Sequence, residues 1–400
     1  MSYPFQLSKI VTTAFILALV LFAPLEAWAR IKLITLPPRE RVEVHLDNAA
    51  VTLVEEERLV PLIQGNNQVD FSWANTGIDP DSIVFRVMEP SGDAVQVLSV
   101  SYPPGENALV WNVGAQQTAT ARVRISYILH QLSRSFSYRA LSDGEEKTLS
   151  LSQYLKVKNH AGESFTDSRI QAGFGGVFQR SIALNESQKL LFASYTNVPI
   201  EKTYTADLED YGYLNAPQKK LKVPMHYVLN NDAEHHLGKT PLAAGKVRIF
   251  QTDSQGSQVF IGEDWGHFTP RDDEMALYLG VAQDIVVKRS IEKSEQQRVA
   301  GNLYNHKVII RYEIENFKNK AVALNIAENL WAVRNELRGY TDQDVEWEIL
   351  DETTFSTAAD PEKSSFEKLY YTTDLPARNA DGSARKIVHK LAILLKNEWR

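Results

Sequence analysis

The stretch Leu242–Arg289 reads LAAGKVRIFQTDSQGSQVFIGEDWGHFTPRDDEMALYLGVAQDIVVKR, and it decides the fold. Charged and apolar residues alternate along Lys246–Ile249, which is the period of a strand with one buried face. A turn cluster follows at 252–256, and the alternation returns along Met275–Leu279. Short strands separated by turn residues predict an antiparallel meander within a sandwich or barrel.

Similar alternation continues through most of the 400 residues. We therefore predict a mainly β protein with two or three antiparallel β-sandwich domains, immunoglobulin-like or related, and few short helices. The predicted domains are 30–115, 116–216 and 217–400. Helical patterns are sparse and are limited to 291–299 and 361–369.

The clearest hairpin pattern lies in the last predicted domain. Apolar residues occupy every second position along Val308–Ile314, a polar turn follows at 317–320, and the alternation returns along Val322–Ile326. Because side chains alternate between the two faces of a strand, Ile310 and Leu324 are predicted to face the core.

Two smaller patterns mark places where strands bend or end. The glycine-rich run at 173–176 lacks the spacing of a phosphate loop, so it favours a bulged or sharply bent strand. Asn75, Asn159 and Asn316 each end an alternating strand and start a turn, a weak echo that does not establish a repeat.

The first residues have the features of a secretory signal peptide. Lys9 supplies a positive charge, residues 10–23 are apolar, and Ala27–Ala29 offers small residues at the positions that a signal peptidase reads. We predict cleavage after Ala29, a mature chain from Arg30, and a periplasmic or secreted protein with no transmembrane span after cleavage. The alternative is an uncleaved membrane anchor.

Parts of the opening stretch resemble the C-terminal domain of the mucoidy-inhibitor-like family of bacterial envelope proteins, a domain of unknown function of the DUF4139 type. The phrases are LAAGKVRIF from Leu242, FIGE from Phe260 and LYLGVAQDIVVKR from Leu277, in the same order and at similar spacing. The similarity runs from about Ala121 to the C-terminus. Longer members carry a helical segment between their domains, and only the short linker 114–120 stands there in this chain. The resemblance implies a β-rich envelope protein and implies no catalytic residues.

Composition excludes several functional classes. The net charge is −7 and no basic block occurs, which argues against nucleic acid as a partner. The chain has no cysteine, so it forms no disulfide and carries no lipid on a signal-peptide cysteine. There is also no G-x-S-x-G motif, so the sequence gives little support to nucleophilic catalysis.

One short segment carries potential metal ligands, but their spacing favours a hydrated loop. Adjacent histidines in an extended chain point to opposite faces, and no further ligand completes a tetrahedral set nearby. We therefore predict no metal and no cofactor. The candidate ligands are Asp232, Glu234, His235 and His236.

A second cluster carries acidic residues around one histidine. Paired carboxylates perform acid–base chemistry when one of them is buried, but these residues flank turns, where charges are usually hydrated. The candidate binding residues are Glu263, His267, Asp272, Asp273 and Glu274.

The sequence therefore favours an exported, non-catalytic β-sandwich protein that binds an envelope component, either a protein or a polysaccharide. The alternative is a hydrolase or metal-dependent enzyme that uses one of the two acidic and histidine clusters. No residue is assigned a catalytic role from the sequence.

Overall fold

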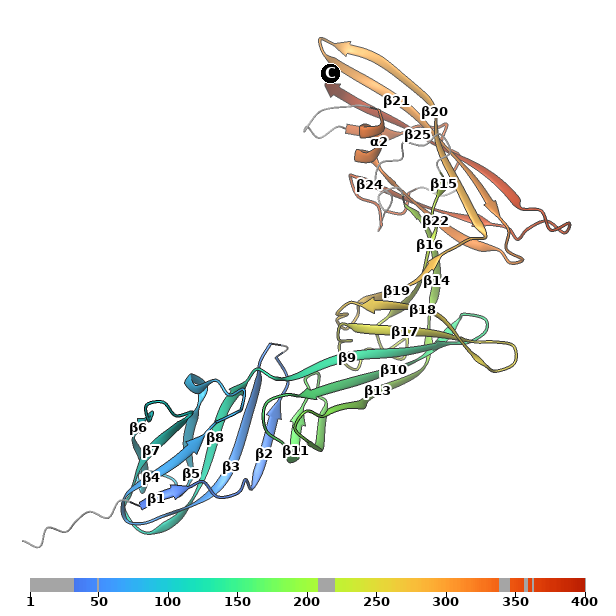
Figure 1. Ribbon diagram of the computed structural model, residues 1–400. Coiled ribbons are helices and arrows are strands. Elements are labelled where there is room, and N and C mark those ends of the chain that lie inside the picture. Colours follow the sequence, from blue (N-terminus) through green and yellow to red (C-terminus); the bar gives the residue numbers. More distant parts are fainter. Residues whose placement is uncertain are drawn as a thin grey trace, which may run out of the picture. The chain divides into compact units, whose positions relative to one another are not determined.

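The computed structural model describes residues 32–48, 50–207, 220–337, 346–355, 359–361 and 363–399. In these residues nearly all of the regular secondary structure is β-strand, in several mostly antiparallel sheets, as the sequence predicts (Figure 1). The predicted signal peptide at 1–29 lies outside the described residues. No helix in the described ranges has the length and apolar character needed to cross a membrane.

The chain forms two compact units, each described separately. Unit 1 contains the described residues up to Ser133 together with Val157–Gln188. Unit 2 contains Arg134–Lys156 and the described residues from Lys189 onward. Strand pairing in unit 1 crosses the predicted boundary between 115 and 116, because β8 (Ala119–Leu129) pairs along its length with β3 (Thr52–Leu62). A strand of the second predicted range therefore belongs to the same sheet as strands of the first.

Unit 1 contains a four-stranded and a six-stranded sheet, with the short 3-10 turn η1 (Pro80–Ser82) before β5. In sheet order, the first consists of β1 (Lys32–Thr35), β4 (Gly65–Ser72), β7 (Ala108–Ala115) and β6 (Val95–Ser101). The second consists of β12 (Val177–Ile182), β11 (Phe165–Gln171), β2 (Arg41–His45), β3 (Thr52–Leu62), β8 (Ala119–Leu129) and β5 (Val84–Glu89).

Aromatic side chains join these two sheets into a sandwich. The ring of Phe71 in β4 lies 5.9 Å from that of Tyr127 in β8, and Trp111 in β7 lies 4.6 Å from Phe85 in β5. Each pair connects one sheet to the other, at separations typical of favourable aromatic contacts. The core of unit 1 therefore lies between its two sheets, as in a β-sandwich.

Unit 2 contains three five-stranded sheets, apart from residues 132–133, 157–159 and 187–188 of the first sheet, which belong to unit 1. The first consists of β13 (Ser187–Pro199), β10 (Thr148–Asn159), β9 (Leu132–Ser142), β17 (Gly245–Thr252) and β18 (Gln258–Gly266). The second consists of β19 (Glu274–Val281), β16 (Pro224–Asn230), β14 (Glu201–Asp207), β22 (Val322–Asn329) and β24 (Lys368–Leu375). The third consists of β15 (Lys220–Leu221), β20 (Ile285–Ala300), β21 (Leu303–Asn316), β25 (Arg385–Trp399) and β23 (Glu346–Ile349).

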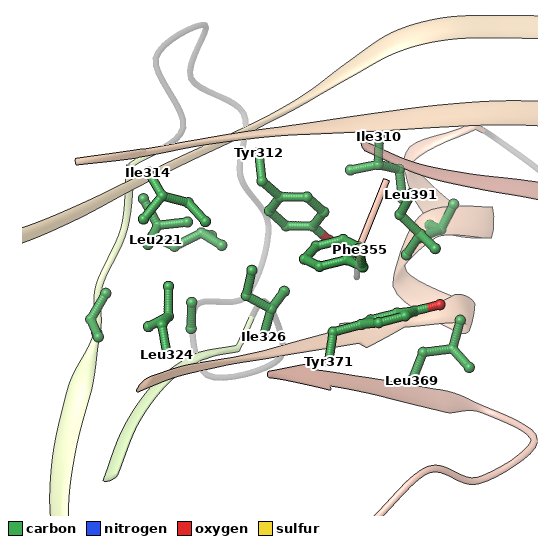
Figure 2. Close-up of a cluster of buried hydrophobic side chains, with 14 of the residues drawn as sticks. Leu221, Ile310, Tyr312, Ile314, Leu324, Ile326, Phe355, Leu369, Tyr371 and Leu391 are labelled. Carbon is green, nitrogen blue, oxygen red and sulfur yellow. The ribbon is translucent and has the colours of Figure 1, made fainter. Parts of the chain in front are cut away.

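The second and third sheets enclose a large apolar core, and we call this pair the C-terminal sandwich. Figure 2 shows Ile310 and Tyr312 of β21 on one side of the core and Ile326 of β22 and Tyr371 of β24 on the other. Phe355 lies between them, with its ring stacked 4.5 Å from that of Tyr371. Apolar side chains from both sheets therefore interdigitate, as the alternation in the sequence predicts.

The hairpin prediction along 308–326 is wrong about which strands pair, but it is right about which face of each strand is buried. Ile310 and Leu324 are both fully buried. However, β21 pairs with β20 and β25, whereas β22 pairs with β14 and β24. The turn at 317–321 carries the chain from one sheet to the facing sheet. A period of two fixes the buried face of a strand but leaves its neighbours open.

The predicted meander also holds only in part. Strands β17 and β18 form an antiparallel pair, but β17 pairs on its other edge with β9 in parallel, and β19 pairs with β16. The glycine-rich run at 173–176 lies in the turn of the β11–β12 hairpin rather than inside a bent strand.

Both predicted helices are wrong. Residues 291–299 belong to β20, because pairing with β21 overrides the helical propensity of their charged residues. The described residues of 361–369 form turns and the start of β24. The helix of the C-terminal sandwich is α2 (Leu330–Glu336), which the Asn329 side chain caps by accepting a hydrogen bond from the Ala332 N–H at 3.0 Å.

Two of the three strand-ending asparagines make the same contacts. The Asn159 amide donates to the carbonyls of Glu163 and Ala183, and its oxygen accepts from the Ala161 N–H. Asn316, in the other unit, makes the equivalent contacts: its amide donates to the Lys320 carbonyl, and its oxygen accepts from the Lys318 N–H. Asn75 differs, because it is exposed and has a positive φ.

We expect Ile310→Ala to lower the free energy of unfolding of the C-terminal sandwich by about 2 to 5 kcal/mol, because it leaves a cavity in the core. Arg311→Ala, on the next and partly exposed position, is expected to change it by no more than about 0.5 kcal/mol. Chemical denaturation of both variants measures the contrast. A larger loss for Arg311→Ala would contradict the buried face of β21.

Candidate functional site

The strongest candidate for a binding site in unit 2 is a hollow of about 630 Å³ on the sheet that contains β9 and β17. We call it the basic-aromatic face. It is defined by the cations Arg139, Lys156, Lys189, Lys246 and Arg248 and by the rings of Tyr154, Phe250 and Trp265. None of the described residues that line this hollow is acidic.

Strand geometry brings the cations together. Lys246 and Arg248 are two residues apart in β17, so they share one face of the sheet. The parallel register places Arg139 of β9 beside Arg248. Like charges at paired positions destabilise a sheet. The parallel register therefore sets two like charges at paired positions, and the carboxylate of Glu263 offsets one of them at Arg248.

Aromatic rings support two of these cations. The guanidinium carbon of Arg139 lies 4.6 Å from the centre of the Phe250 ring, and the Lys189 ammonium lies 4.1 Å from the centre of the Tyr154 ring. Such contacts attract the cation electrostatically and fix its position on the face. Trp265 is 57% exposed, which leaves its ring free to stack on a ligand.

Glu263 borders this face and contacts two of its cations. Its carboxylate accepts hydrogen bonds from Lys246 Nζ at 2.6 Å and from Arg248 Nε at 3.0 Å. These two bonds lower the pKa of the Glu263 carboxyl, so it is ionised at neutral pH. Because the ion pairs are exposed to water they are weak, and an anionic ligand can replace them.

The predicted metal ligands do not converge on one point. His235 Nδ1 lies 2.7 Å from Asp232 Oδ1, whereas His236 Nδ1 lies 2.7 Å from the Asn197 carbonyl oxygen. Glu234 is exposed in the same turn. The two imidazoles therefore have separate partners.

The predicted acidic cluster is divided between a strand and a loop. Glu263 lies within β18, on the basic-aromatic face. His267, Asp272 and Asp273 are exposed in the turn that joins β18 to β19, and Glu274 begins β19. The Asp273 carboxylate accepts the N–H of Glu274 at 2.8 Å, which stabilises the turn. Of this cluster, only Glu263 belongs to the candidate site.

Glu43, His45 and Glu55 on β2 and β3 of unit 1 have ligand atoms close enough to hold a metal ion. His45 Nε2 lies 3.7 Å from Glu43 and 3.5 Å from Glu55. Arginines already approach both carboxylates: Arg41 and Arg169 at Glu43, and Arg124 at Glu55. Because arginine cannot lose its charge, it opposes a cation there. The cluster acts as a ladder of ion pairs across the sheet.

Sequence reasoning found only part of the basic-aromatic face. Lys246 and Arg248 are the charged residues of the alternating pattern along Lys246–Ile249, so the sequence predicts that they share one face of a strand. Arg139, Lys156 and Lys189 come from three other strands. The strand of Arg139 pairs with β17 in parallel, and the paired residues are 109 positions apart in sequence. No local signal predicts such a pairing.

No protein family and no curated protein matches this chain. The resemblance to the mucoidy-inhibitor-like family therefore stays a prediction that rests on the three quoted phrases.

Proposed function

We propose that this is an exported binding protein that holds an acidic polysaccharide of the cell envelope on its basic-aromatic face. The observation that carries the proposal is the gathering of five cations around three aromatic rings, of which Trp265 is exposed, with Glu263 as the carboxylate beside them. The predicted signal peptide and the resemblance to an envelope family support the location.

Charge complementarity favours a polyanion over a neutral ligand. The whole chain carries a net charge of −7, so the basic character of this face is local. Arginine guanidinium groups form paired hydrogen bonds with carboxylates and phosphates. Arg139 and Arg248 lie on neighbouring strands, so a chain of repeating anionic groups can contact both.

The aromatic rings favour a polysaccharide among the polyanions. Sugar rings present C–H groups that pack on the face of an aromatic side chain, and the exposed Trp265 offers such a face. The hollow is partly open to solvent, which suits a long, flexible chain more than a small molecule enclosed in a pocket.

Binding of polygalacturonate, a polymer of uronic acid, tests the proposal. The readout is the change in tryptophan fluorescence that is lost in Trp265→Phe, because the chain contains seven tryptophans. We expect the affinity to fall steeply as salt rises, because the polymer releases condensed counterions on binding. The double variant Arg139→Ala/Arg248→Ala is expected to bind at least about tenfold more weakly, which corresponds to ~1.4 kcal/mol.

Lys386→Ala is the matched control, because Lys386 is a half-exposed strand cation of unit 2 that is paired with Glu313, much as Arg248 is paired with Glu263. It should leave binding unchanged. Equal binding of neutral dextran, an equal loss in the control, or tighter binding of single-stranded DNA or an acidic protein would each refute the proposal.

N-terminal sequencing of the native protein tests export, and an intact Met1 would contradict it.

A further inference from the structure

A serine, a histidine and a glutamate meet at one end of the C-terminal sandwich, where β20, β21 and β25 run side by side (Figure 1). Ser294 Oγ lies 2.8 Å from His306 Nε2. His306 Nδ1, on the opposite side of the ring, lies 3.5 Å from Glu398 Oε2. The three side chains therefore form a row in the order serine, imidazole, carboxylate.

Strand geometry explains how residues so distant in sequence meet. Ser294 pairs with Val308, and His306 is two positions before Val308 in β21, so Ser294 and His306 are diagonal neighbours on one face. The register between β21 and β25 contains one extra residue on β25 between Leu395 and Glu398. Without it, Glu398 would face away from His306.

A positive φ marks this irregularity. Asn397, just before Glu398, has a φ of 56°, and its N–H is bound by the Asn305 side chain at 3.1 Å. A non-glycine residue rarely adopts such a φ. Bulges of this kind redirect a side chain and are frequent next to active sites.

The burial of the three groups matches the roles of a catalytic triad. The side chains of His306 and Glu398 are each only 3% exposed, whereas Ser294 is exposed to solvent. The serine can thus meet a substrate while the other two are shielded. The Arg334 Nε of α2 donates to Glu398 Oε1 at 3.2 Å and fixes the carboxylate.

Electrostatics keep the carboxylate ionised. Burial by itself raises the pKa of Glu398, but its interactions with His306 and Arg334 outweigh burial, so the pKa is lowered overall. An ionised glutamate at Nδ1 favours the imidazole tautomer that carries its proton there. Nε2 is then free to accept the proton of the Ser294 hydroxyl.

We propose that Ser294, His306 and Glu398 form a nucleophilic site that hydrolyses small carboxylic esters. Ser294 Oγ bonds to the carbonyl carbon while its proton passes to His306 Nε2. The carbon–oxygen bond to the alcohol breaks, and the alcohol leaves with that proton. Water then attacks the acyl carbon and gives a proton to Nε2. The bond between the acyl carbon and Ser294 Oγ breaks, Oγ takes that proton from Nε2, and the free acid is released.

Glu398 acts as a positioning residue, because it touches His306 and not the substrate. The 3.5 Å separation from Nδ1 is long for a hydrogen bond, and such contacts often tighten only when substrate is bound. This site is separate from the basic-aromatic face and does not depend on the proposed binding function.

Labelling of the full chain with a fluorophosphonate tests the nucleophile directly. We expect a covalent adduct on the peptide that contains Ser294, and no adduct there in Ser294→Ala. The matched control is Ser290→Ala, an exposed serine of the same strand that pairs with Arg311 on the outer face. It should be labelled like the unchanged protein.

Hydrolysis of p-nitrophenyl acetate tests turnover. We expect a rate above that of Ser294→Ala, a loss of about 10² to 10⁴-fold in His306→Ala, and for Glu398→Gln a lower kcat at nearly unchanged KM. Circular dichroism checks that each variant is folded. An unlabelled Ser294, or a labelled Ser294 with hydrolysis no faster than Ser294→Ala, would overturn the proposal and leave only a structural hydrogen bond.

Discussion

Glu328→Gln is expected to lower the free energy of unfolding of the C-terminal sandwich by about 3 to 5 kcal/mol. The Glu328 carboxylate is completely enclosed and accepts hydrogen bonds from Arg289 Nε and Nη2, both at 2.8 Å. It also accepts a hydrogen bond from the hydroxyl group of Tyr312. Glutamine keeps the shape but removes the negative charge that the buried guanidinium needs.

The large loss of stability expected for Glu328→Gln follows from the buried charge of Arg289 that the substitution leaves behind. Arg289 keeps its charge in proteins, and its side chain is fully buried. Glu336 stays as a partner at 2.8 Å from Nη1, but it is itself 19% exposed and bonds a different nitrogen. Two donors of the guanidinium would then face an uncharged amide inside the core, where desolvation is most costly.

Hydrogen exchange of amides in β21 and β25 measures the change within this sandwich, which avoids a two-state assumption for a chain with two units. The control is Glu348→Gln, which removes the charge of a glutamate that is 44% exposed and pairs with Lys396. It should leave the exchange nearly unchanged. A similar response of the two variants would show that the buried pair contributes little.

The sequence predicted which faces of strands are buried because that information is local. Ile310 and Leu324 face the core as the alternation requires. Strand pairing is not local: β14 pairs with β22 in parallel, across more than a hundred residues. The helix prediction at 291–299 failed for the same reason, because pairing with a distant strand decides the conformation of a polar segment.

Both candidate sites were hidden from the sequence by this non-local pairing. The basic-aromatic face draws on five strands, and β17 supplies the two cations that the alternation revealed. Ser294, His306 and Glu398 carry no motif, and a single extra residue in β25 sets the direction of the glutamate. A local pattern cannot predict where such a residue falls.

We expect Asn316→Ala, at the asparagine that ends β21, to lower the free energy of unfolding of the C-terminal sandwich by about 3 to 5 kcal/mol. Its amide group approaches the carbonyl oxygens of Lys320, Leu375 and Pro376, the last at 2.8 Å. Its oxygen accepts the Lys318 N–H at 2.9 Å. Asn316 is only 1% exposed, so alanine leaves these backbone groups enclosed without their partner.

Asn319→Ala provides the control, because Asn319 is an exposed asparagine of the same turn. Its replacement should change the free energy of unfolding by less than about 0.5 kcal/mol. Hydrogen exchange in β21 and β24 measures both variants, with amides of unit 1 as an internal reference that should not respond. A small effect of Asn316→Ala would mean that water or a shift of the turn replaces the lost bonds. The equivalent contacts of Asn159 would then be expected to be dispensable for unit 1 as well.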